Sequence, residues 1–361
     1  MTAALGHAPA PVLERLRAAP RRDDYPREPV QIVREAGWLA PSSFDAGALF
    51  DRLFTAGRGD LAAGRLFEGH VNALHLIERY GAPGQIQAAH GAARAGGLGG
   101  VWAASDPGDP ARLDADGVLR GRLGYCSGAE KLAFALAAVE DANGERRLIR
   151  LAPGELAERF DHTAWRTTGM AATRSAALEL DGLQPGVDAV IGAPGDYLAE
   201  PFFSAGAARF AAVQTGGLIA VFDAARDHLA RTGRHGADAQ AARLCEMAAA
   251  CEAAYAAVRD ALSRLAPAID PGRPAPPGAA EAWIPIADGA RQQVMNAAPG
   301  VIERAMACVG AAGFAADHPL AGAVSDLQMY LRQPAPDASR RRHGEAVGSG
   351  ALALSFDLPA P

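Results

Sequence analysis

The segment RSAALELDGL, residues 174–183, places a β-rich zone in the middle of the chain. Alternate residues in it could face a core while Glu179 and Asp181 face water, as in a half-buried strand. Other short β-like runs precede it, separated by turn signals at Ala115–Gly117 and Asn143–Glu145, where Asn and Gly tolerate positive φ. Regularly spaced short strands predict a small antiparallel barrel or sandwich over residues 98–198.

Helical patterns flank this zone on both sides. In the N-terminal part, residues 1–97, helices are expected around three segments: Val30–Ala36, Ala46–Thr55 and Gly69–Tyr80. In the C-terminal part, apolar residues recur at three- and four-residue steps from Leu244 to Leu265. Another helix covers Phe210 to Ala224, and two more are expected at Ala287–Val309 and Leu320–Leu331. Four such helices predict a bundle over residues 199–361.

The composition is that of an ordinary folded protein. The chain has 361 residues, of which 49% are hydrophobic and 21% charged, which predicts more than one domain. Its net charge of -6 gives no basic excess for nucleic acid. We expect no membrane span and no signal peptide, because no apolar run is long enough and the N-terminus lacks the required layout. Its 4 cysteines form no CxxC pair, which favours reduced thiols and a cytoplasmic location.

Four stretches of the chain share their order and approximate spacing with one enzyme family. They are VWAASDPG (Val101–Gly108), GRLGYCSGA (Gly121–Ala129), WRTTGMAATRSAALELDGLQP (Trp165–Pro185) and CVGAAGFAADHPLAGAVSDLQMY (Cys308–Tyr330). The first is similar to a strand ending in Thr-Glu-Pro-Gly, and the last to a Gly-Gly-x-Gly-Phe turn followed by an Arg-Asp helix. In these stretches the chain resembles the acyl-CoA dehydrogenases. The resemblance implies an α+β multidomain fold: an N-terminal helical domain (1–97), a small middle β-barrel (98–198) and a C-terminal four-helix bundle (199–361).

The resemblance also implies FAD, held between the β domain and the bundle. Ser105, Tyr125 and Ser127 occupy the positions that surround the flavin in the family. Their chemistry is suitable, because hydroxyl groups can bond the polar edge of the isoalloxazine and an aromatic ring can cover its apolar face. The alternative is that Ser105 and Ser127 only finish strands and that Tyr125 packs in the core.

A second set of residues corresponds to the diphosphate end of FAD. Arg231 or Arg234 stands where the family has an arginine that meets the diphosphate. The turn from Gly310 to Gly313 would bring backbone close to the FAD of another subunit, since small residues permit that approach. The same turn could be a plain helix C-cap. Because the resemblance places this turn against the FAD of another subunit, it implies a homodimer or homotetramer.

The catalytic carboxylate of the family is missing from its expected positions. Acyl-CoA dehydrogenases need a base that removes the α proton of an acyl thioester. Pro334 occupies the common position and Gly206 the position used by a minority branch, and residues 201–220 contain no carboxylate. Asp337 is a candidate for a relocated base, although an exposed helix cap is the simpler interpretation.

Three hypotheses follow from these observations. The first is an FAD-dependent enzyme that desaturates an acyl thioester, carried by CoA or a carrier protein, with a relocated base. The second is a flavin-dependent monooxygenase of the same fold, in which a histidine assists. Gln333 occupies that histidine's position, and the other candidates are His162, His235, His318 and His343. The third is an inactive homologue that acts as a partner subunit. We rank a flavin oxidoreductase first.

Overall fold

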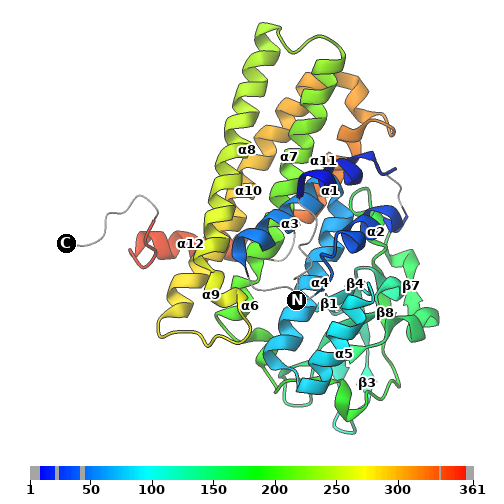
Figure 1. The fold of residues 1–361 in the computed structure, drawn as a ribbon. Coiled ribbons are helices and arrows are strands. Elements are labelled where there is room, and N and C mark those ends of the chain that lie inside the picture. The colour runs from blue at the N-terminus through cyan, green and yellow to red at the C-terminus, as the bar shows by residue number, and fades with distance from the viewer. Residues whose placement is uncertain (1–8, 21–23, 41–44, 333–334, 355–361) are drawn as a thin grey trace, which may run out of the picture. The chain divides into compact units, whose positions relative to one another are not determined.

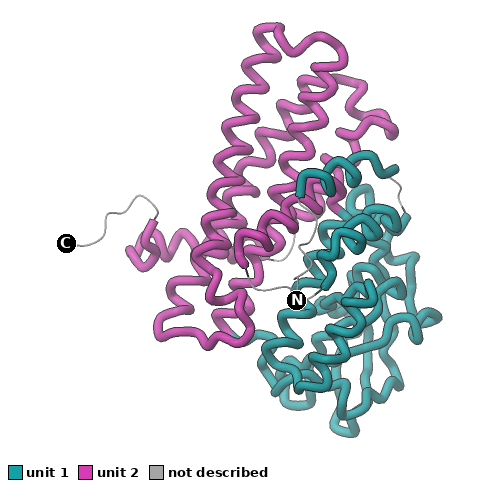
Figure 2. Tube along the Cα trace, in the orientation of Figure 1, with its two compact units in different colours: residues 1–43, 62–199 teal, residues 44–61, 200–361 magenta. Residues whose placement is uncertain are grey.

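The computed structural model describes residues 9–20, 24–40, 45–332 and 335–354. Contacts group the chain into two compact units, coloured separately in Figure 2. Unit 1 comprises residues 1–43 and 62–199, and unit 2 comprises residues 44–61 and 200–361. The division into three domains that the sequence suggests remains a prediction.

The described helices of unit 1 cover one another and the larger sheet (Figure 1). They are α1 (Pro9–Ala18), α2 (Arg27–Glu35), α4 (Leu61–Tyr80) and α5 (Pro83–Arg94). Leu74 and Ile77 of α4 belong to one buried cluster with Phe134 and Leu136 of the sheet. Helix α5 begins at Pro83, whose missing N–H is not needed in a first helical turn. The helices predicted in the N-terminal part are confirmed as α2, α3 and α4.

The described strands form two sheets. The six-stranded sheet has the order β3-β2-β5-β6-β9, with β1 paired to β5, and the three-stranded sheet has the order β4-β8-β7. The strands of the first are β1 (Gly99–Trp102), β2 (Arg112–Leu113), β3 (Leu119–Arg120), β5 (Phe134–Glu140), β6 (Arg146–Leu151) and β9 (Val190–Ile191). Those of the second are β4 (Arg122–Cys126), β7 (Phe160–Asp161) and β8 (Ala176–Glu179).

The larger sheet is mixed, which corrects the expectation of a purely antiparallel arrangement. β1 pairs with β5 in parallel, whereas β5 and β6 form an antiparallel hairpin. A parallel pair needs a long crossover connection, and the chain between Trp102 and Phe134 supplies it. Both predicted turns are confirmed, with Gly117 at φ 75° and Gly144 at φ 80°. Closure of the strands into a barrel remains a prediction.

The strand in the segment that indicated the β zone is buried on both faces. Ala176, Ala177 and Leu178 of β8 are all at most 5% exposed, so the predicted alternation is wrong there. The reason is that β8 is the central strand of its sheet, between β4 and β7. Asp181 lies beyond the strand and is exposed as predicted, whereas Glu179 is half-buried.

Unit 2 is a helical bundle (Figure 1). Its described helices are α3 (Ala46–Gly59), α6 (Phe202–Ala205), α7 (Ala207–Arg231), α8 (Asp238–Arg264), α9 (Ala266–Ile269), α10 (Ala279–Val309), α11 (Pro319–Tyr330) and α12 (Pro336–Gly348). The predicted bundle helices correspond to α7, α8, α10 and α11. Helix α10 starts at Ala279, before the expected residue 287, because Pro285 is accommodated inside it.

Helix α3 is an addition to the predicted bundle, since it packs on α7 and α8. Two glycines make the approach to α7 possible. A Cβ on Gly57 would lie 2.2 Å from the Val213 carbonyl oxygen, and one on Gly216 would lie 2.3 Å from that of Phe54. The hydrophobic spacing of α3 predicted a helix correctly, but it carried no information on which elements the helix would contact.

Short 3-10 helices connect many of these elements. Those in the described residues are η1 (Ala129–Lys131), η2 (Pro153–Arg159), η3 (His162–Ala164), η4 (Ala171–Thr173), η5 (Val187–Ala189), η6 (Asp196–Leu198) and η7 (Gly310–Phe314).

Among the described residues, one helical stretch, Phe202–Arg231, contains an 18-residue window with a mean hydropathy of 1.3. By length and composition it could cross a membrane. However, 67% of its most apolar window is buried inside the structure, as expected for the core helix of a bundle. The cytoplasmic location remains a prediction.

Candidate functional site

Ser105, Tyr125 and Ser127, the three predicted ring-contacting residues, are brought together in unit 1. Ser105 pairs with Leu123 of β4 in an isolated antiparallel bridge, and backbone hydrogen bonds of 2.8 and 2.9 Å flank this pair. Tyr125 lies two residues further along β4, and Ser127 directly follows the strand. The pairing thus places the three side chains at neighbouring positions of two adjacent chain segments.

The hydroxyl group of Ser105 is buried and has no hydrogen-bond partner among the described residues. Leaving a buried polar group unpaired costs about 1–3 kcal/mol. Native proteins keep few such groups, and each points to an unseen partner or a functional role. The interpretation that Ser105 only finishes a strand leaves this hydroxyl unexplained.

Tyr125 is not a core residue, which removes the structural alternative for it. Its side chain is 66% exposed, and its backbone has φ 54° in the left-handed region. Non-glycine residues adopt that region at a cost of about 1–3 kcal/mol and are concentrated at functional sites. The ring packs edge-on against Trp165, at 5.9 Å between centroids and 88° between planes. One broad aromatic surface therefore remains accessible within unit 1.

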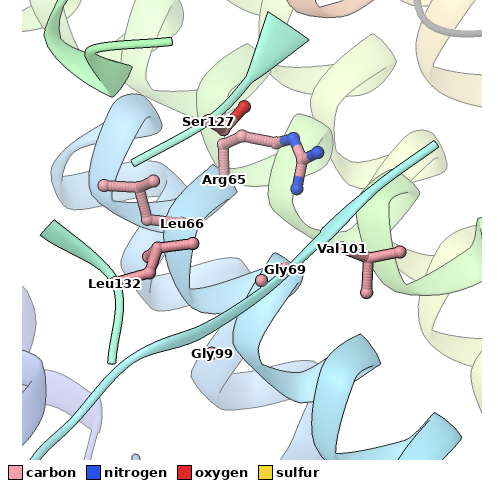
Figure 3. A pocket seen from close by; sticks show the side chains of 8 residues that line it. Arg65, Leu66, Gly69, Gly99, Val101, Ser127 and Leu132 are labelled. Atoms are coloured by element: carbon pink, nitrogen blue, oxygen red, sulfur yellow. The ribbon is translucent and has the colours of Figure 1, made fainter. Parts of the chain in front are cut away.

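Ser127 lines a small open hollow between α4, β1 and the loop after β4 (Figure 3). The empty volume of the hollow is about 200 Å³. Its lining consists of Arg65, Leu66, Gly69, Gly99, Gly100, Val101, Ser127 and Leu132. The polar side chains are those of Ser127 and Arg65, and aliphatic side chains and glycines make up the rest. That volume includes space open to solvent and is smaller than the roughly 300–1,000 Å³ of typical ligand pockets, so the hollow would form only one part of a site for a larger ligand.

Arg65 lines the same hollow as Ser127 and was not a candidate in the sequence analysis. Its guanidinium contacts the carboxylate of Glu68 one helical turn later, at 2.8 Å, and the Glu68 side chain is 3% exposed. The only signal in the sequence was a charged residue inside the mainly apolar run LAAGRLF at the start of α4. Such a pattern is ordinary for an amphipathic helix, so it could not single out Arg65.

Ser175 and Thr173 are further residues that the sequence analysis quoted but did not single out. Both are 1% exposed. The Ser175 hydroxyl donates to the Ser127 hydroxyl at 3.2 Å, and the hydroxyls of Thr173 and Ser175 lie 2.9 Å apart. The backbone N–H of Gly128 donates to the Thr173 carbonyl at 2.8 Å. These contacts join the start of β8 to the loop that carries Ser127.

The four candidate histidines lie in different surroundings. His162 contacts the Glu130 carboxylate at 3.0 Å in unit 1. In unit 2, His318 bonds His228 at 3.1 Å, and His343 bonds the Pro285 carbonyl oxygen at 2.9 Å. His235 is exposed in the turn between α7 and α8. A catalytic role for any of them remains untested.

The basic run from Arg340 to His343 in α12 is not simply a solvated face. Arg342 forms a two-pronged ion pair with Asp288 of α10, at 2.8 Å for each contact, and the Asp288 side chain is 2% exposed. His343 packs beside Gly289, where a Cβ would meet its ring at 2.6 Å. Arg340 also donates to the Gln292 side chain of α10 at 3.2 Å, so α12 is docked on α10 through three of these residues, whereas Arg341 pairs with Glu345 on the surface.

The residues predicted for the diphosphate end of the cofactor belong to unit 2. Arg231 ends α7, Arg234 lies in the following turn, and both are exposed. Burial, His318 and these two arginines lower the pKa of His228 below its ordinary value. The bond between His228 and His318 joins this end of α7 to the start of α11. Two arginines and two histidines thus gather at one end of the bundle.

The Gly310–Phe314 turn, η7, connects α10 to α11 in the same unit. Gly310 has φ 74°, in the region that favours glycine, whereas Gly313 is buried. Gly310 is the C-cap of α10, which agrees with the interpretation of this turn as a plain helix C-cap. A contact of this turn with a cofactor or with another subunit remains a prediction.

The proposed relocated base, Asp337, is exposed in the first turn of α12. The helix is capped by Ala335 rather than by Asp337. Gly206 lies between α6 and α7, and the surrounding sequence supplies no carboxylate. Gln333 and Pro334 lie outside the described residues.

Comparison with known proteins finds relatives by structure alone. No family model and no curated sequence matches the chain. TdsC from Paenibacillus sp. A11-2, solved with FMN and indole and also named dibenzothiophene monooxygenase, matches with a TM-score of 0.78 at 17% identity, over 95% of this chain and 94% of its own. The chain has the acyl-CoA dehydrogenase fold. KijD3, solved with FMN and a dTDP-linked amino sugar, matches with a TM-score of 0.79 at 18% identity, over 96% and 93% of the two chains.

The nitrososynthase from Micromonospora carbonacea var. africana has the acyl-CoA dehydrogenase fold as well. It matches with a TM-score of 0.74 at 18% identity, over 98% of both chains. At such identities the likeness establishes the fold of this chain and leaves its activity open. Each of these matches covers nearly the whole chain, so the fold extends over both units.

Proposed function

We propose that this protein is a flavin-dependent monooxygenase with the acyl-CoA dehydrogenase fold. The unpaired hydroxyl of Ser105 supports the proposal most directly, because a bound ring with acceptor atoms would satisfy it. The backbone bridge between Ser105 and Leu123 places Tyr125 and Ser127 a few positions along the adjacent segment. A polar edge bonded by two hydroxyls and an apolar face covered by an aromatic ring suit isoalloxazine.

FMN is the flavin that we propose, in place of the FAD implied by the resemblance. The structural neighbours TdsC and KijD3 were solved with FMN. Arg231 and Arg234, of which one was expected to meet the FAD diphosphate, are both exposed at the end of α7 and in the following turn. Their role in FAD binding remains the alternative.

Monooxygenation is favoured over desaturation by the acid-base groups of the chain. Desaturation of an acyl thioester needs a base at the α carbon. The described candidate, Asp337, is exposed, and residues 201–220 contain no carboxylate. In a monooxygenation, the reduced flavin supplies two electrons, one oxygen atom of O₂ enters the substrate, and the other leaves as water.

The described residues would hold and shield the ring rather than carry out an acid-base step. Ser105 and Ser127 would bond its polar atoms, and Tyr125 would cover one face. Leu66 and Leu132 line the hollow beside Ser127 and would keep water from it. In the alternative, a flavin-free partner subunit, no ligand would satisfy the buried hydroxyl of Ser105, which has no hydrogen-bond partner among the described residues.

Flavin titration of the purified protein tests this proposal. We expect FMN to bind and to lose affinity by roughly 5- to 10-fold in Ser105→Ala, since one hydrogen bond contributes about 1 kcal/mol. With chemically reduced FMN, labelled O₂ and indole as the probe substrate, we expect label in the product. Anaerobic bleaching of bound flavin by butyryl-CoA would instead favour desaturation of an acyl thioester. If the protein bound neither FMN nor FAD, both the monooxygenase and the desaturase hypotheses would be rejected.

A further inference from the structure

Two histidines of unit 2 join the end of α7 to the start of α11. Nδ1 of His228 lies 3.1 Å from Nε2 of His318, and the ring centroids are 5.2 Å apart. Both side chains are half-buried. Neither histidine has a part in the proposed binding of the flavin ring, so their contact needs its own explanation.

His318 also caps helix α11 with its other ring nitrogen. Its Nδ1 accepts the backbone N–H of Leu320 at 3.2 Å. Donors in the first turn of a helix have no partner within the helix, and Pro319 has no N–H to offer. The Leu320 N–H is therefore satisfied by the histidine ring. Nδ1 of His318 can accept it only while that nitrogen carries no hydrogen.

One arrangement of hydrogens satisfies both contacts while both rings are neutral. A neutral imidazole carries one hydrogen, so His318 must carry its hydrogen on Nε2. That hydrogen is directed to Nδ1 of His228, which must be unprotonated to accept it. Donation therefore runs from the Leu320 N–H to His318, and from His318 to His228.

Uptake of one proton breaks this arrangement on either ring. On His318 the proton would occupy Nδ1 and oppose the Leu320 N–H. On His228 it would occupy Nδ1 and face the hydrogen on Nε2 of His318. If His318 moved its hydrogen to Nδ1 to accept from His228, the helix cap would be lost instead. Each singly protonated state of the pair thus loses one of its two hydrogen bonds.

The charges around the pair also oppose protonation. The charged and titratable groups on the elements at this end of the bundle include Arg231, Arg234, Arg243, Cys308 and Asp317. Burial, His318 and the first two arginines lower the pKa of His228. Asp317 would favour protonation, but it is exposed, so solvent screens its charge.

We propose that His228 and His318 form a pH-dependent link that holds the start of α11, and the preceding turn η7, on α7. Opening the bond between the rings removes the obstacle to proton uptake, so a falling pH favours the open form. Because the pKa of His228 is lowered from 6.5 in the closed form, the link is closed above that pH and opens as the pH falls below it.

Hydrogen exchange of the full-length protein, followed by mass spectrometry of residues 310–322, tests this link. Rates at about pH 8 and about pH 5 are compared after correction for the intrinsic pH dependence of exchange. We expect protection of this segment to fall roughly 5- to 10-fold at the lower pH, the range for one lost hydrogen bond. A segment inside α8 should stay protected at both pH values, which shows that the opening is local.

The hydrogen positions can be measured directly. In protein labelled with ¹⁵N-histidine, NMR at about pH 8 should show the hydrogen of His318 on Nε2 and that of His228 also on Nε2. In His228→Ala the link is absent, so residues 310–322 should already exchange at about pH 8 as fast as the wild type does at about pH 5.

Two asparagine variants serve as matched controls. Asparagine is a good N-cap and does not titrate, so His318→Asn should keep the cap of α11 but lose the pH dependence. His235 is exposed in the turn between α7 and α8. His235→Asn should keep the pH dependence of the wild type, because this histidine does not belong to the pair.

Each contrary outcome would overturn the inference. One is equal protection of residues 310–322 at both pH values in the wild type. Another is a pH dependence that persists in both His228→Ala and His318→Asn, since other groups would then cause it. A pH dependence that disappears in His235→Asn would assign it to the wrong histidine. A hydrogen on Nδ1 of His318 at about pH 8 would contradict the order of donation.

Discussion

Buried His70 forms two hydrogen bonds to backbone groups inside unit 1. Its Nε2 lies 2.8 Å from the Leu39 carbonyl oxygen, and its Nδ1 accepts from the Gly99 N–H at 2.8 Å. Nε2 therefore carries the proton. We expect His70→Leu to lower the free energy of unfolding by about 2–4 kcal/mol near neutral pH, because both backbone groups lose their partner. Urea unfolding monitored by circular dichroism measures the change.

The same residue makes stability depend on pH. Burial lowers the pKa of His70 from 6.5 to about 4. Below pH 6.5 the unfolded chain takes up a proton that the folded chain does not, so the folded state loses stability as the pH falls toward 4. Well above pH 6.5, the contribution of His70 to the free energy of unfolding no longer changes with pH. His70→Leu should remove this part of the pH dependence; an equally steep curve in the variant would show that other groups cause it.

Asp223 carries the ion pair that joins α3 to α7. Its carboxylate accepts from Arg58 Nε at 2.8 Å and Nη2 at 3.1 Å, and its side chain is 5% exposed. We expect Asp223→Asn to cost about 3–5 kcal/mol, since breaking a buried pair leaves a charge uncompensated. Asp227→Asn is the control: its pair with Arg226 is exposed and contributes at most about 1 kcal/mol. If both variants lost the same free energy of unfolding in urea, the buried Arg58–Asp223 pair would not be the stronger of the two.

At the scale of single residues, the sequence led to the neighbourhood of the site but not to its full membership. Ser105, Tyr125 and Ser127 could be named as candidates because they fall in stretches that resemble a known family, and their role remains a prediction. Arg65 and Ser175 could not, because their role depends on a helix and a loop meeting in space. His70 gave no signal either, since a histidine in a helix has the same pattern whether it is buried or exposed.

At the scale of elements, the close approach of α3 to α7 depends on glycine. A Cβ on Gly216 would lie 2.3 Å from the Phe54 carbonyl oxygen and 2.5 Å from the Arg58 nitrogen, both backbone atoms. We expect Gly216→Ala to destabilise unit 2 by about 2–4 kcal/mol, because one of the helices must shift. Thermal unfolding followed by circular dichroism, together with limited proteolysis of α3, measures the effect.

Gly91→Ala in α5 is the matched control for this substitution. A Cβ there meets no atom within 4 Å in the part of the chain that the structure describes. Alanine is a better helix former than glycine, so this variant should be more stable by about 0.5–1 kcal/mol. If Gly216→Ala lowers the stability while Gly91→Ala raises it, packing and not helix propensity determines the effect at Gly216. Two variants with the same sign would refute that explanation.

The order of the elements was more predictable than their partners. Helical spacing and turn residues located α2, α4, α8 and the β5–β6 hairpin, because these are local properties of the chain. The parallel pairing of β1 with β5 and the docking of α3 in unit 2 are contacts between distant segments. Periodicity describes which face is apolar and leaves open what covers it, so these features required the structure.

At the scale of the whole molecule, we predict an assembly of at least two subunits. The resemblance implies it, and Phe314 of η7 supplies a physical motive, since its side chain is 77% exposed. Burying a phenylalanine contributes about 1.5–3 kcal/mol. We therefore expect Phe314→Asp to raise the dissociation constant of the assembly by roughly 10- to 100-fold. Sedimentation velocity over a dilution series measures the shift.

Val187→Asp is the control for that experiment. Val187 of η5 is 91% exposed but lies in unit 1, outside the turn that the resemblance assigns to subunit contact. An acidic residue there should leave the assembly unchanged, because no apolar contact is lost. If the wild-type protein sediments as a monomer at every concentration and still binds flavin tightly, a single chain completes the site, and the exposed Phe314 needs another explanation.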